Sequence, residues 1–168
     1  MTASLLISEK AQRLVKRCGT RDPFKICREA NIHVYVTELG SLKGMYSYIK
    51  RNRWAFLNEN LSEQMTRIVL AHEIGHDQLH RELAKGQMLQ EFTMFSMTSI
   101  TEYEANIFAA EILLPDEDML ELCYEGYSNI QIAARLESDA NLVGIKLDVL
   151  RRRGVDLLPV EHQHNFLK

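Results

Sequence analysis

The sequence predicts an α+β fold that is mostly helical and contains a small antiparallel sheet of about three strands. Apolar residues recur at helical spacing through residues 65–83 and 101–114, which predicts two long helices with apolar faces. Residues 31–38 instead alternate between apolar and polar side chains, which is typical of a half-buried strand. We therefore expect the sheet to precede the first of the two long helices.

The N-terminal part of the chain is expected to form two helices followed by three strands. Gly19 ends the first helix, because glycine adopts the left-handed conformation that follows many helices. Pro23 suits the first position of the second helix. A polar hairpin at residues 50–53 joins the last two strands and makes them antiparallel. The expected elements are helices at residues 4–18 and 22–30, and strands at residues 31–38, 45–49 and 54–57.

The rest of the chain is expected to be helical. Ser62 can cap the helix that follows it, and Pro115 ends the second long helix. Residues 87–99 are rich in Met and Phe without a clear period, and we expect a packed loop there rather than a flap. The remaining predicted helices are a short one opening at residues 116–118 and a C-terminal pair at residues 127–136 and 140–152, with the proportions of a helix-turn-helix.

Length and charge narrow the possibilities further. The 168 residues are expected to form one domain, with the N-terminal helices and sheet in 1–62, the two long helices in 63–123, and the helix pair and tail in 124–168. The net charge of −3 argues against a dedicated nucleic-acid binder, which would carry a basic surplus. The one dense basic run, residues 151–153, fits a solvated helix end.

The sequence also favours a cytoplasmic location. Cys18, Cys27 and Cys123 are odd in number and widely separated, so we expect buried reduced thiols rather than disulfides or zinc ligands. No segment approaches the roughly 18 apolar residues of a membrane span. The N-terminus has no basic segment followed by an apolar run, as a signal peptide would.

The first long helix contains the motif H-E-x-x-H at residues 72–76. His72 and His76 lie four residues apart and therefore project from the same face of the helix, where two imidazoles can hold one metal ion. Glu73 points about 100° further round the helix, beside the ion rather than at it. This is the arrangement of zinc peptidases, in which the glutamate is a general base and not a ligand.

A catalytic zinc ion usually has three protein ligands, so a third must come from elsewhere in the chain. The second long helix offers Glu102, Glu104 and Glu111. Glu104 and Glu111 fall on one apolar side of that helix, whereas Glu102 faces nearly opposite. Because a carboxylate within an apolar stripe needs a neutralising partner, Glu104 and Glu111 are the candidates, and helix geometry does not choose between them.

The chain resembles the ImmA/IrrE family of metallopeptidases over most of its length. The residues that carry the resemblance are H-E-I-G-H-D-Q-L-H from His72 to His80 and E-Y-E-A-N-I-F-A-A-E-I-L-L-P from Glu102 to Pro115. The resemblance implies a zincin-like metallopeptidase core, a Zn²⁺ cofactor and Glu104 as the third ligand. Glu111 would then support the site or pair with a nearby Arg or Lys.

Two further residues are candidates for a supporting role. His80 lies seven residues after Glu73 and so on almost the same stripe of the helix. It could orient a metal ligand or stabilise an oxyanion. Tyr103 is a second candidate for the oxyanion, on sequence proximity alone.

The expected function is zinc-dependent endopeptidase activity. The resemblance implies site-specific cleavage of a helix-turn-helix transcriptional repressor, often encoded beside the peptidase on a mobile element or prophage, which would relieve repression. In that setting the C-terminal helix pair would dock a protein rather than read DNA. The alternative is a non-catalytic regulator in which a metal is structural and the protein binds a transcription factor or DNA.

Overall fold

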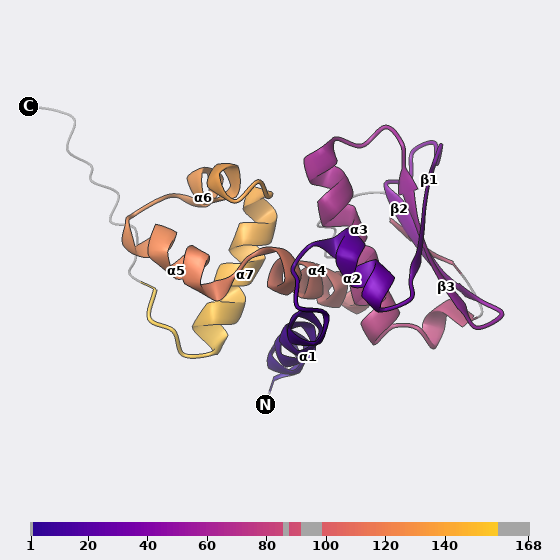
Figure 1. The fold of residues 1–168 in the computed structure, drawn as a ribbon. Helices are drawn as coiled ribbons and strands as arrows, with labels where there is room; N and C mark the ends of the chain where they lie inside the picture. Colours follow the sequence, from indigo (N-terminus) through magenta and orange to yellow (C-terminus); the bar gives the residue numbers. More distant parts are fainter. Residues whose placement is uncertain (1, 86–87, 92–98, 158–168) are drawn as a thin grey trace, which may run out of the picture.

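The computed structural model describes residues 2–85, 88–91 and 99–157 (Figure 1). The elements share the mostly helical order that the sequence predicts. The helices are α1 (Ala3–Cys18), α2 (Pro23–Glu29), α3 (Glu63–Leu79), the 3₁₀ turn η1 (Leu83–Lys85), α4 (Ile100–Leu113), α5 (Asp116–Tyr124), α6 (Asn129–Arg135) and α7 (Ala140–Arg152). The strands are β1 (His33–Thr37), β2 (Gly44–Ile49), β3 (Asn52–Asn58) and β4 (Leu89–Glu91).

The α+β class is confirmed, but the predicted sheet is wrong in two respects. It has four described strands in the order β1-β3-β2-β4, and β1 pairs with β3 in parallel. The chain leaves β1, skips one position to form β2, and returns by the β2–β3 hairpin into the gap, so β3 runs in the direction of β1. The fourth strand, β4, lies within the segment that we expected to be a loop and pairs with β2. Residues 87 and 92–98 of that segment, together with residue 86 and the tail from residue 158, lie outside the described residues.

Polar side chains cap several of the helices, and the predicted helix starts at Ser62 and Asp22 are confirmed. Ser62 accepts a hydrogen bond from the backbone N–H of Met65 at the start of α3, and Ser99 does the same for Glu102 at the start of α4. Asp22 caps α2, which has Pro23 at its first position. Each cap satisfies a backbone donor that the helix itself leaves without a partner.

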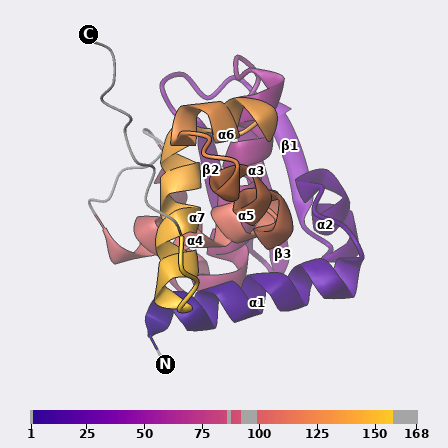
Figure 2. The same cartoon turned by 90° about the vertical axis from the view of Figure 1, so that its left-hand side faces the viewer.

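The helices lie on one side of the sheet (Figure 1). α3 packs against β2 and β3, and α4 packs against α3. The long helix α1 runs across the lower edge of the molecule in Figure 2 and contacts α4 and α7. The C-terminal pair, α6 and α7, packs together beside α4. Within the described part of the chain, no helix has both the length and the apolar character needed to cross a membrane.

α3 and α4 approach each other closely at Gly75. A Cβ atom at this position would lie 3.0 Å from the Cα and the backbone oxygen of Ala105 and 3.1 Å from Cβ of Phe108. Ala105 and Phe108 are both buried residues of α4, where backbone and packed side chains cannot easily move aside. The absence of a side chain at Gly75 therefore sets how near the two long helices lie.

We expect Gly75→Ala to destabilise the protein by about 1–3 kcal/mol, the usual cost of overpacking a core. The matched control is Gly144→Ala in α7, where an added Cβ would meet only the Asn129 side chain at 3.7 Å. That control should be neutral or stabilising by up to about 1 kcal/mol, because alanine is the better helix former. Chemical denaturation measures both changes, and equal stability of the two variants would contradict the inferred close approach.

Candidate metal centre

The two motif histidines face each other from successive turns of α3. His72 and His76 are both buried, with exposed fractions of 0% and 1%. Their Nε2 atoms lie 3.0 Å apart. The spacing of four residues along a regular helix produces this pairing, as expected from the sequence.

A carboxylate from α4 completes the cluster. Glu102, in the first turn of α4, places Oε2 3.1 Å from Nε2 of His72 and Oε1 3.4 Å from Nε2 of His76. Ligand atoms of these three residues lie within 4.8 Å of one another, and no other such group is found among the described residues. Two imidazoles and one carboxylate are the ligand types that catalytic zinc sites use.

The protonation of these groups fits a cation. Nδ1 of His72 lies 2.9 Å from Oδ1 of Asn106, an oxygen that only accepts. In the neutral imidazole that donates this hydrogen bond, Nε2 carries the lone pair that a metal ligand needs. Burial lowers the pKa of His76 to about 4, although Glu102 opposes this shift, so this imidazole is neutral at neutral pH. A divalent ion would be held by the two neutral imidazoles and the carboxylate of Glu102.

Glu73 follows His72 directly in α3 and is almost fully buried. Its side chain occupies space that exists because residue 44 of β2 is glycine. A Cβ atom at Gly44 would lie 2.5 Å from Oε1 of Glu73 and 2.5 Å from Cγ1 of Val69. β2 therefore confines the Glu73 carboxylate on the side of Gly44.

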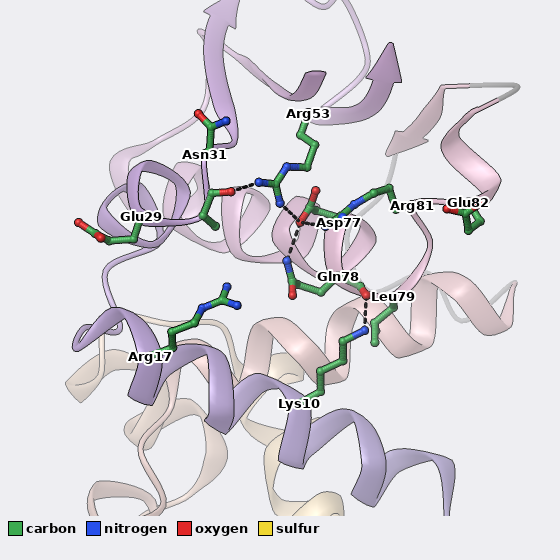
Figure 3. Close-up of a pocket in the computed structure, with 11 residues that line it drawn as sticks. Lys10, Arg17, Glu29, Asn31, Arg53, Asp77, Gln78, Leu79, Arg81 and Glu82 are labelled. Carbon is green, nitrogen blue, oxygen red and sulfur yellow. Dashed lines mark hydrogen bonds and ion pairs between the residues drawn. The ribbon is translucent and has the colours of Figure 1, made fainter. Parts of the chain in front are cut away.

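The residue after His76 anchors the end of α3 to the sheet. Asp77 is fully buried and accepts a hydrogen bond from the hydroxyl of Tyr46 at 2.7 Å. It also pairs with Arg53 at 3.4 Å and Arg81 at 3.0 Å, as Figure 3 shows on the wall of a cavity between α1 and the ends of α2 and α3. Because these partners come from β2, β3 and the turn after α3, they hold the helix end that carries His76.

Glu104, which the resemblance implies as the third ligand, is not part of the cluster that the structure brings together. Its Oε2 lies 2.9 Å from Nε2 of His80, and Glu102 occupies the position expected of Glu104. The sequence argument took the apolar side of α4 as the side that faces the metal. However, residues 105–112 of α4 are buried all around the helix, so the apolar stripe does not identify the side that faces α3.

Glu102 and Asn106 are the two functional candidates that sequence reasoning missed. They lie four residues apart and so share one face of α4, and both contact His72. The spacing E-x-x-x-N was the available signal, because a ligand and a group that orients a histidine are needed on the same face of a helix.

The two remaining candidates lie outside the cluster. Glu111 is fully buried and pairs with Lys146 at 2.9 Å and Arg153 at 2.6 Å, so it joins α4 to the C-terminal helices. Tyr103 is partly buried and packs against the hydrophobic core.

Comparison with known proteins finds a family model and two relatives that match this chain. The family model for the IrrE N-terminal-like domain, a peptidase family, matches residues 27–148. Immunity region protein 2 of Bacillus phage phi105 is 40% identical over 112 residues, which cover 66% of this chain and 70% of that protein. Metallopeptidase ImmA of Bacillus subtilis (strain 168) is 29% identical over 147 residues, 84% of this chain and 83% of that protein.

Loss of a group that only orients a metal ligand weakens metal binding by up to about a hundredfold. Because Glu102 is expected to bind the metal itself, Glu102→Ala should weaken zinc binding by more than this. Glu104→Gln should cost much less, because its carboxamide oxygen can still accept a hydrogen bond from His80. Competition with a chromophoric chelator measures both affinities. A larger loss of zinc affinity in Glu104→Gln than in Glu102→Ala would identify Glu104 as the third ligand.

Proposed function

The chain belongs to the ImmA/IrrE family of metallopeptidases, and from this premise we propose that it is a zinc-dependent endopeptidase. We propose His72, His76 and Glu102 as the metal ligands and Glu73 as the general base. The observation that carries the proposal is the convergence of three ligand atoms within 4.8 Å of one another. Glu73 follows His72 directly in α3, and its carboxylate lies against Gly44 of β2.

The donor set favours a catalytic over a structural ion. A structural zinc site is closed by a fourth protein ligand, whereas a catalytic site keeps one position open. Among the described residues the cluster supplies three ligands. His80, the nearest further imidazole, directs Nδ1 at Nδ1 of His76 and Nε2 at Glu104.

The residues around the metal site have different roles in the proposed peptide hydrolysis. Bound zinc would supply Lewis acidity, which acidifies water and polarises a carbonyl group. The carboxylate of Glu73 takes the proton of the attacking water and passes it to the departing amine. Asn106 holds the His72 ring in the orientation that presents Nε2, and Asp77 holds the end of α3.

The proposed substrate is a helix-turn-helix transcriptional repressor, cleaved at one site so that repression is relieved. The resemblance to the ImmA/IrrE family implies this substrate. The similarity to an immunity region protein of a phage supports a setting on a prophage or mobile element. A repressor substrate would place the enzyme in the cytoplasm.

The test is incubation of the purified, zinc-loaded protein with the repressor encoded beside its gene. We expect one defined cleavage that stops when a chelator removes the metal. Glu73→Gln should retain zinc and slow cleavage by about 10²–10⁴-fold, the usual contribution of a general base. Binding of the repressor without cleavage by the wild-type protein would instead favour a non-catalytic regulator.

Gly44→Ala tests the position of Glu73 without altering a ligand. The added methyl would displace the Glu73 carboxylate and press on Val69. Because a displacement of about 1 Å can cost about 10²-fold in rate, we expect a loss in kcat of that order with unchanged zinc affinity. Unchanged kcat in a folded variant would show that Glu73 does not need this space.

A further inference from the structure

We propose that His80 and Glu104 act together as a positioning pair that presents Nε2 of His76 to the metal. The role rests on the zinc site proposed above. It also gives Glu104 a function different from that of a ligand.

The three side chains form a continuous chain of contacts. Oε2 of Glu104 lies 2.9 Å from Nε2 of His80, and Nδ1 of His80 lies 3.0 Å from Nδ1 of His76. His76 then meets His72 through its other ring nitrogen, Nε2. The chain thus begins at a carboxylate on α4 and ends at the metal cluster on α3.

The direction of each hydrogen bond follows from counting protons. A carboxylate only accepts, so Nε2 of His80 carries the proton that it donates to Glu104. When both rings are neutral, each carries one N–H, and in that state Nδ1 of His80 accepts and Nδ1 of His76 donates. Nε2 of His76 is left with its lone pair toward Nε2 of His72 and Glu102. This is the tautomer that a metal ligand must have.

These hydrogen bonds also argue against two other roles for His80, as a metal ligand and as a donor to an oxyanion. Both of its ring nitrogens are engaged, one with Glu104 and one with His76, so neither is available to bind the metal or to donate to an oxyanion. His80 is 5% exposed, so water does not easily replace either partner. The side chain of Glu104 is 27% exposed and lies at the edge of the buried chain.

The two histidine ligands are therefore supported differently. His72 donates to the neutral amide of Asn106, whereas His76 donates to an imidazole that is itself held by a carboxylate. Hydrogen bonding to a group backed by a negative charge raises the basicity of a ligand more than bonding to an amide does. Loss of His80 or Glu104 should therefore lower the affinity for the metal.

The test measures zinc affinity of the full-length protein by competition with a chromophoric chelator. His80→Phe and Glu104→Ala should each bind zinc about 10–100-fold more weakly, the range for losing a group that orients a metal ligand. Because the two residues act in series, the double variant should bind zinc no more weakly than His80→Phe alone. His80→Gln should recover most of the affinity, since its amide can both accept and donate.

A spectroscopic measurement on the metal-free protein separates positioning from a structural role. In the wild type, ¹⁵N shifts should show His76 protonated at Nδ1. In His80→Phe the proton should be shared between Nδ1 and Nε2, because the acceptor is gone. Glu117→Ala, a change at an exposed carboxylate of α5, is the matched control for Glu104→Ala and should leave affinity and tautomer unchanged.

Three outcomes would overturn the proposal. They are wild-type zinc affinity in both single variants, multiplied losses in the double variant, and a loss in Glu104→Ala as large as that in Glu102→Ala, which would make Glu104 a ligand. Since Glu104 lies at the edge, its variants keep the test valid if His80→Phe does not fold. A wild-type protein that binds zinc but cleaves nothing would refute the peptidase proposal and leave this one standing.

Discussion

The close contact between α3 and α4 is the constraint on which the site depends. Gly75 lies between His72 and His76, and its missing side chain lets the backbone at Ala105 approach α3. Ala105 in turn lies beside Asn106 and three residues after Glu102, on the face of α4 that meets His72. The distance between the helices therefore fixes the distance between imidazole and carboxylate, because side chains this short cannot bridge a wider gap.

Buried charge in this fold is balanced locally. Asp77 is matched by Arg53 and Arg81, and Glu111 by Lys146 and Arg153, since an unpaired charge in the interior costs several kcal/mol. Each set joins elements that are distant in the sequence, β3 to α3 for Asp77 and α4 to α7 and the residue after it for Glu111.

The position of Glu102 shows where prediction from sequence reached its limit. Spacing along α3 correctly indicated that His72 and His76 face one another, because both lie on one regular helix. The third group comes from another helix, and its choice depends on how α4 is rotated about its own axis. With buried residues all around α4, hydrophobic pattern carries no information on that rotation.

What the sequence determined by itself is local. It set the helices and their caps, the β2–β3 hairpin, the α+β class and the pairing of two histidines four residues apart, all of which follow from interactions within a few residues. The tertiary structure alone decided that β1 runs parallel to β3, that β4 joins the sheet, that Glu102 faces the histidines, and that Glu104 turns to His80. The reason is that each of these depends on how separate elements pack, which at Gly75 is set by contact between two backbones rather than by any pattern along one of them.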